Sequence, residues 1–236
     1  MSQLKNNDPL GQALIDEWNG VRKEKLWTDA PNFAPEEFPI SYLMRSYRDM
    51  PALEKELLQK ASGRVLDVGA AAGSHSLYLQ EQGLDVTALE MSPLACELMQ
   101  RRGINSIERR DLWSYEPDEL FDSVLLIMNG LGLAGTLDQL PKFLDKVRSW
   151  LRPNGQILFD SSDVSYLYDP GYFPEDRYFG EFRYRFRYGG LLSTTFPWVF
   201  VDPESLKEVL NKVGGEWTEE LKGDHYDYGG VIRFRE

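Results

Sequence analysis

The chain has 236 residues, of which 42% are hydrophobic and 27% charged, a balance typical of a globular protein with a sizeable core. Lysine and arginine number 26 against 38 acidic residues, so the net charge of −12 argues against nucleic-acid binding, which requires a basic surface. Cys96 is the only cysteine, and no apolar run approaches the roughly 20 residues that span a bilayer. We therefore expect a reduced, cytoplasmic protein with neither a nucleic-acid nor a membrane partner.

The N-terminal residues mix helical spacing with prolines. Leu10, Ala13 and Leu14 recur at the interval of one helix face, and a proline-rich joint follows over residues 30–39. We expect residues 1–60 to form a helical cap and residues 61–236 to form the main domain.

Residues 63–161 alternate short apolar runs with longer periodic segments. Strands are expected over 64–68, 85–89, 104–107, 121–128 and 156–159, with helices over 74–82, from Pro93 to the stop at Gly103, and over about 140–151. Leu140, Phe143, Leu144, Val147 and Leu151 form the apolar stripe of the third helix. This alternation indicates βαβ units and a mainly parallel sheet.

The last region is rich in aromatic residues. Aromatic residues alternate with arginines over 182–188, which predicts a half-buried strand with a solvated basic face, and Gly189-Gly190 predicts a hairpin turn into 191–201. Asp202-Pro203 begins another helix, and strands near 217–222 and 231–235 end the chain. We expect a doubly wound, Rossmann-like α/β fold with seven strands, helices on both faces and an inserted hairpin within about 162–201.

The loop after the first strand carries the most specific motif. A dinucleotide fingerprint places glycines at the first, third and sixth loop positions, which here hold Gly69, Ala71 and Ser74. At the first, third and fifth positions the loop instead has Gly69, Ala71 and Gly73, preceded by Asp67. A carboxylate is favourable near a cationic ligand and unfavourable beside a pyrophosphate.

This D-x-G-x-A-x-G pattern resembles motif I of the class I S-adenosylmethionine-dependent methyltransferases. The resemblance covers roughly 63–160 and the final helix and strands, including the Leu151 to Gly155 turn, and departs at Ala71, where glycine is usual. It implies S-adenosylmethionine as cofactor and S-adenosylhomocysteine as product. The residues that it implies for the cofactor are Asp67, Gly69, Ala70, Ala71, Gly73, Glu90 for the ribose, Met91, Asp111 for the adenine amino group, and Leu112 against the ring. A solvated strand end is the alternative for Glu90, and a helix N-cap is the alternative for Asp111.

Further residues are candidates on weaker grounds. Asn129, at the end of the fourth strand, is expected to point into the methyl-transfer pocket beside the cofactor, with a structural turn as its alternative. Arg45 is expected to bind the cofactor carboxylate, with a surface ion pair as its alternative. The candidates for the substrate pocket are Tyr42, Tyr47, Asp160, Ser162 and His225. His75 is expected to cap or pack. We identify no catalytic base and expect no metal, because the fourth strand offers an amide where a metal site needs a carboxylate.

These residues favour an enzyme that moves the methyl group of S-adenosylmethionine to a small-molecule acceptor by in-line displacement. The alternatives are a non-catalytic S-adenosylmethionine-binding sensor or assembly module and an NAD-dependent oxidoreductase. The acceptor, the methylated atom and the oligomeric state are left open by the sequence.

Overall fold

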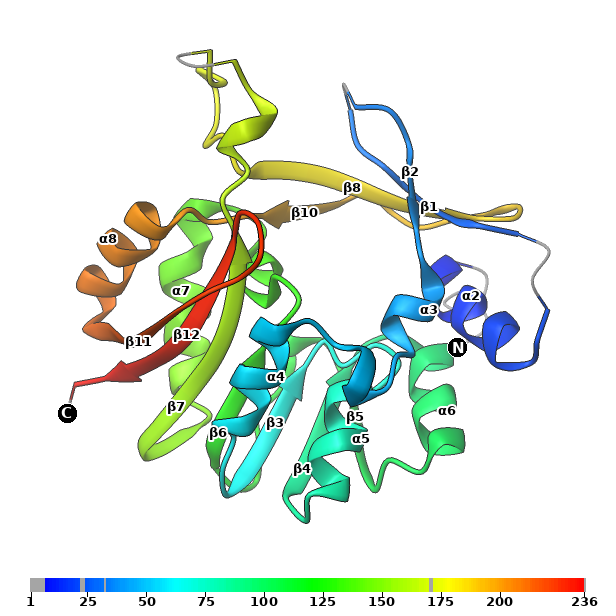
Figure 1. Ribbon diagram of the computed structural model, residues 1–236, viewed down its shortest axis with the longest axis horizontal. Helices are drawn as coiled ribbons and strands as arrows, with labels where there is room; N and C mark the ends of the chain where they lie inside the picture. The colour runs from blue at the N-terminus through cyan, green and yellow to red at the C-terminus, as the bar shows by residue number, and fades with distance from the viewer. Residues whose placement is uncertain (1–6, 22–23, 32, 170–171, 236) are drawn as a thin grey trace. The chain divides into compact units, whose positions relative to one another are not determined.

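The computed structural model describes residues 7–21, 24–31, 33–169 and 172–235. Helices and strands alternate along the middle of the chain, as predicted (Figure 1). A seven-stranded, mostly parallel sheet has the order β11-β12-β7-β6-β3-β4-β5, and a second sheet has the order β10-β8-β1-β2, with β9 paired to β8. The expected Rossmann-like α/β fold is therefore confirmed.

The strands of the larger sheet lie close to the predicted ranges. They are β3 (Arg64–Val68), β4 (Asp85–Glu90), β5 (Ser106–Arg109), β6 (Phe121–Leu126), β7 (Leu151–Ser162), β11 (Gly215–Lys222) and β12 (Asp227–Phe234). β4 pairs with β5 and β6 pairs with β7 in parallel, while β12 pairs antiparallel with both β7 and β11.

The chain divides into two compact units, which we describe separately. The first comprises Met1–Met50, Asp67–Tyr115 and Arg183–Phe196, and the second comprises Pro51–Leu66, Glu116–Phe182 and Pro197–Glu236. Helical elements of the first unit are α2 (Pro9–Trp18), α3 (Ile40–Leu43), η1 (Tyr47–Asp49), α5 (Ser74–Glu81), α6 (Pro93–Arg102) and η2 (Leu112–Ser114). Those of the second are α4 (Ala52–Gln59), η3 (Gly130–Ala134), η4 (Leu137–Gln139), α7 (Leu140–Arg148), η5 (Ser165–Leu167) and α8 (Pro203–Val213).

Helix α6 of the first unit begins and ends where its sequence predicts. The Ser92 hydroxyl accepts from the backbone N–H of Ala95, and Gly103 ends the helix at a φ of 89°, which only glycine adopts readily. Asp8 caps α2 by accepting from the Gly11 N–H at 2.8 Å and also accepts from the Ser92 hydroxyl at 2.6 Å. One buried carboxylate thus joins the starts of α2 and α6.

Two strands of the N-terminal region were not predicted. β1 (Leu26–Asp29) and β2 (Glu36–Phe38) pair with each other, and β1 pairs antiparallel with β8 (Glu181–Tyr188), beside which it runs in Figure 1. Asp29 forms ion pairs with Arg185 and Arg187, both at 3.2 Å. The alternation of aromatic residues and arginines predicted for β8 is confirmed, but two of the arginines form ion pairs with Asp29. The N-terminal region therefore contains strands as well as helices.

In the second unit, α7 buries the predicted stripe of Leu140, Phe143, Leu144 and Val147, and it packs beside α8. Asp202 caps α8, and Gly214 ends it. Leu151 belongs to β7 rather than to α7, and β7 runs on through the left-handed Asn154, so the predicted turn lies inside the strand.

Other boundaries differ for local reasons. β5 begins two residues later than predicted because the N–H of Ile104 bonds back to Met99 at the end of α6. β6 ends at Leu126 because Met128 and Asn129 are left-handed. The strand predicted over 191–201 is divided into β9 (Leu191–Leu192) and β10 (Phe196–Val199).

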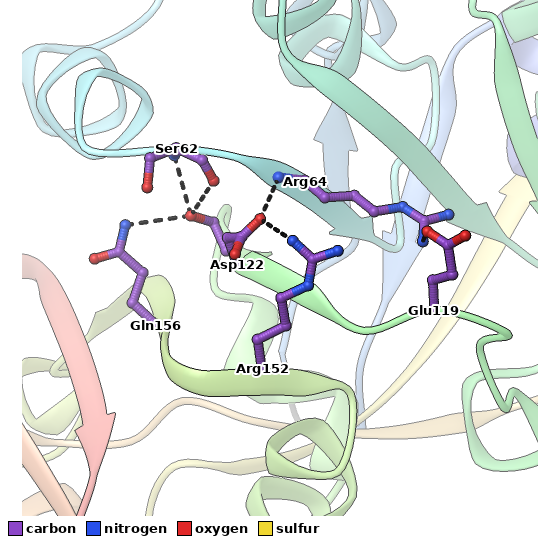
Figure 2. Close-up of polar contacts among 7 residues, drawn as sticks. Ser62, Arg64, Glu119, Asp122, Arg152 and Gln156 are labelled. Carbon is purple, nitrogen blue, oxygen red and sulfur yellow. Dashed lines mark hydrogen bonds and ion pairs between the residues drawn. The ribbon is translucent and has the colours of Figure 1, made fainter.

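Asp122 braces the amino ends of strands β3, β6 and β7 (Figure 2). One of its carboxylate oxygens accepts from the Arg64 backbone N–H at 2.7 Å and from the Arg152 guanidinium at 3.0 Å, while the Arg64 side chain pairs with Glu119. A polar cavity of about 370 Å³ beside this brace is lined by Asp122, Gln156 and Arg233, among others. It lies at the ends of β6 and β7 opposite to those that carry Asn129 and Asp160.

Over the described parts of the chain, we find no helix with the length and apolar character that crossing a membrane requires.

Candidate cofactor site

The loop after β3 is left-handed at alternate residues. Gly69, Ala71 and Gly73 have φ angles of 72°, 49° and 73°. These are the first, third and fifth loop positions, so the spacing seen in the sequence follows from the backbone path. The N–H groups of Gly69 and Ala70 both donate to the carbonyl of Leu89, which joins the loop to the end of β4.

Glu90, the last residue of β4, is fixed beside this loop. Its side chain is 9% exposed, and its two oxygens accept from the N–H groups of Ala71 at 2.9 Å and of Ser92 at 2.8 Å. Burial raises the pKa of Glu90, although these hydrogen bonds oppose that rise. The solvated strand end considered as the alternative for Glu90 is therefore wrong. The next residue, Met91, is 65% exposed, which leaves an apolar side chain open to a ligand.

Asp111 follows the next strand, β5. The N–H of Arg110 donates to the Glu90 carbonyl, so the ends of β4 and β5 meet here. The exposed Asp111 side chain accepts from the Trp113 N–H at 2.8 Å and caps η2, the contact expected of its structural alternative. Leu112, beside it, is half-buried.

Asp67 and His75 flank the loop in the chain, in β3 and in the first turn of α5. The buried Asp67 carboxylate accepts from the Ser76 hydroxyl at 2.6 Å and thereby fixes the first turn of α5. His75 is buried in the same turn, as expected for a packing residue.

Arg45 is buried, whereas the alternative considered for it expects a position at the surface. It is 7% exposed, its guanidinium lies 3.8 Å from the centroid of the Tyr42 ring, and it donates to the Tyr42 carbonyl. Tyr47 stacks on Tyr78 of α5, with 3.8 Å between the ring centroids. A small cavity of about 140 Å³ is lined by Arg45, Tyr47, Tyr78 and neighbouring residues of α5 and α6.

The remaining candidates belong to the second unit. The N–H of Asn129 donates to the buried Asp160 carboxylate at 2.6 Å, so these two residues are brought together. The side-chain oxygen of Asn129 is buried and has no hydrogen-bond partner among the residues that the structure describes. Ser162 is the last residue of β7, and His225 is exposed in the loop between β11 and β12.

Two comparisons with known proteins identify the family. A family model described as a methyltransferase domain matches residues 42–220, which is well over half of the chain. The solved structure of an S-adenosylmethionine-dependent methyltransferase from Bacteroides fragilis, in complex with S-adenosylhomocysteine, is 35% identical with a TM-score of 0.89, over 98% of this chain and 96% of that one. The chain belongs to the S-adenosylmethionine-dependent methyltransferases.

Weaker similarities agree with this assignment. This chain is 27% identical over 115 residues to YqeM of Bacillus subtilis (strain 168), whose name assigns it provisionally to the methyltransferases. That match covers 46% of this chain and 45% of YqeM, so it spans less than half of this curated relative. The sugar N-methyltransferase KedS8 from Streptoalloteichus sp ATCC 53650 shares the fold, with a TM-score of 0.62 and 16% identity over 84% of this chain and 94% of that one.

The residues beside the loop fit the cofactor of this methyltransferase family, S-adenosylmethionine. Enzymes that bind dinucleotides also hold the ribose with an acidic residue at this strand end, so the fixed Glu90 carboxylate fits an adenosine and does not by itself distinguish the two cofactors. A carboxylate has about four lone-pair sites, so Glu90 can accept ribose hydroxyls in addition to its two backbone donors. The match to the methyltransferase family sets aside the dinucleotide alternative.

Two residues of this region were missed in the sequence. Ser74 and Arg102 hydrogen-bond to each other beside the loop, at 3.2 Å. In the sequence, Arg102 is only a basic residue in the last turn of a helix, and so is the adjacent Arg101. No sequence pattern therefore distinguishes the arginine that reaches the loop from its neighbour.

Proposed function

We propose that this methyltransferase transfers the methyl group of S-adenosylmethionine to a small-molecule acceptor by in-line displacement. We also propose that the loop 69–73 binds S-adenosylmethionine together with Glu90 and Asp111. The observation that carries the proposed site is the hydrogen bond between the Ala71 N–H and the Glu90 carboxylate. It fixes an acidic acceptor beside a backbone that turns sharply enough to approach a ligand closely.

Each residue of the proposed site has a separate task. Glu90 accepts from the ribose hydroxyls, while Met91 and Leu112 offer apolar surface to the adenine. Asp111 accepts from the adenine amino group, since capping η2 uses only part of its acceptor capacity. The backbone of the loop binds the amino-acid end, and the planar guanidinium of Arg45 suits its carboxylate.

We propose that Asn129, Asp160 and Ser162 line the acceptor pocket, with His225 of the same unit as a further candidate. Tyr42 and Tyr47 of the first unit stay predictions for substrate contact. The two consecutive left-handed residues Met128 and Asn129 support the proposed pocket, because backbone strain gathers at functional sites. Bound S-adenosylmethionine supplies an activated methyl group on a sulfonium, an excellent leaving group. The protein therefore has to orient the acceptor and exclude water, which needs no elaborate acid–base set.

The experiment is calorimetric titration of S-adenosylhomocysteine into the wild type and the variants Glu90→Ala and Glu97→Ala. Glu97 is a matched control, because it lies on the exposed face of α6 and pairs with Arg101. We expect the Glu90 variant to bind at least about 100-fold more weakly, since two or more charge-assisted hydrogen bonds of roughly 1.5 kcal/mol each are lost. Wild-type affinity in a Glu90→Ala protein that keeps its circular dichroism spectrum would refute the proposed site.

A further inference from the structure

Helix α5 holds the segment 42–47 at two points one turn apart. The Ser74 hydroxyl donates to the Leu43 carbonyl at 2.7 Å, and the Tyr78 ring stacks on Tyr47 with only 6° between the two ring planes. Residues four apart lie on the same face of a helix, so Ser74 and Tyr78 present one contact surface. The segment that they hold carries Tyr42 and the buried Arg45.

Arg102, in the last turn of α6, reaches the same place. One of its guanidinium nitrogens donates to the Ala72 carbonyl at 2.5 Å and to the Ser74 hydroxyl at 3.2 Å. A serine hydroxyl has one proton to donate, and Ser74 directs it to Leu43, so its lone pair is available to Arg102. The resulting chain of hydrogen bonds joins α6 to the glycine loop, to α5 and to the segment 42–47.

We propose that Arg102 and Ser74 are positioning residues that clamp the segment 42–47 against the loop 69–73 and so determine the affinity for the cofactor. This inference rests on the proposed cofactor site. If the loop 69–73 and Arg45 are held in place before binding, they lose less conformational freedom when the ligand arrives. Binding is then stronger without any new contact to the ligand. Neither Arg102 nor Ser74 has to touch the cofactor for this effect.

The neighbouring Arg101 shows what an arginine at this helix end does without such contacts. It is exposed and pairs with Glu97 one turn earlier in α6 at 2.5 Å. Exposed pairs of this kind contribute little to stability. The same charge change at position 101 therefore controls for the helix terminus and for the net charge of the protein.

The test is calorimetric titration of S-adenosylhomocysteine into the full-length wild type and the variants Arg102→Gln, Arg101→Gln, Ser74→Ala and Ser74→Thr. Each of the variants Arg102→Gln and Ser74→Ala loses two hydrogen bonds, none of them to the ligand. We expect dissociation constants about tenfold higher for both, because these contacts act on the ligand only through the position of the site. Arg101→Gln should stay within about twofold of the wild type, and Ser74→Thr should recover most of the affinity because it keeps the hydroxyl.

A second readout distinguishes positioning from general destabilisation. Amide hydrogen exchange in the segment 42–47 should become faster in Arg102→Gln and Ser74→Ala but not in Arg101→Gln, while α7 keeps its protection. Affinity unchanged in both clamp variants, or an equal loss in Ser74→Ala and Ser74→Thr, would overturn the clamp. If instead the wild type and Glu90→Ala bind S-adenosylhomocysteine alike, the proposed cofactor site itself is wrong.

Discussion

Ala71 occupies a left-handed position where glycine has no steric penalty. Its φ is 49°, and its N–H donates to the Glu90 carboxylate. We expect Ala71→Gly to stabilise the protein and to leave the affinity for S-adenosylhomocysteine unchanged, because the backbone hydrogen bond is kept.

The magnitude follows from two opposing terms. A non-glycine residue in the left-handed region costs about 1–2 kcal/mol, which the substitution recovers. Glycine also gives the unfolded chain more freedom, which costs about 0.4–1 kcal/mol. The middle values of the two ranges leave a net gain of about 0.8 kcal/mol, which raises the Tm of a chain of this size by about 2–3 °C.

The adjacent Ala72 supplies a control with the opposite sign. It is 0% exposed and does not have a positive φ. Ala72→Gly loses a buried methyl group, about 0.8 kcal/mol, and adds the same unfolded-state freedom, so its Tm should fall by about 2–7 °C. Differential scanning calorimetry of both ligand-free variants measures the contrast. A lower Tm for Ala71→Gly than for the wild type would refute the argument from backbone strain.

Three further predictions concern single contacts. In urea unfolding, Asp122→Ala should lower the free energy of unfolding by about 1–3 kcal/mol because the Arg64 N–H loses its acceptor. The control Glu119→Ala removes only an exposed ion pair and should lower it by under about 1 kcal/mol. Burial raises the pKa of Glu90, so the folded protein holds this proton to higher pH than the unfolded chain, and stability falls as the pH rises through that interval. The free energy of unfolding of Glu90→Gln in urea should lack this fall over the same pH range. If the wild type and Glu90→Gln show the same pH dependence, the fall does not come from Glu90. Asn129→Gly should raise the Tm by a few degrees, or about 1 kcal/mol, since it removes a left-handed side chain and a buried oxygen that has no partner among the described residues. A lower Tm would show that the Asn129 side chain stabilises the turn.

The sequence predicts those parts of the fold whose signals are local. Ser92-Pro93 and Gly103 define α6 because capping and left-handed termination depend on a few neighbouring residues. The stripe of α7 is predictable because one helix face meets one core. The glycine loop belongs to the same class, since its alternate left-handed residues require small side chains at fixed spacing.

Features that depend on distant partners were not predictable. β1 has four residues and no alternation of its own, and its pairing partner β8 lies more than 150 residues later in the chain. Arg45 is buried, although arginine usually remains exposed unless a partner element covers it. The bond between Ser74 and Arg102 depends on α6 returning to the start of α5, which no local pattern encodes.

The position of the ribose in a crystal structure of the S-adenosylhomocysteine complex is the most direct test of the proposed cofactor site. We predict both ribose hydroxyl oxygens at about 2.5–3.0 Å from the carboxylate of Glu90, with the adenine against Leu112. A complex in which the nucleoside lies elsewhere, while Glu90 keeps only its bonds to Ala71 and Ser92, would contradict the account.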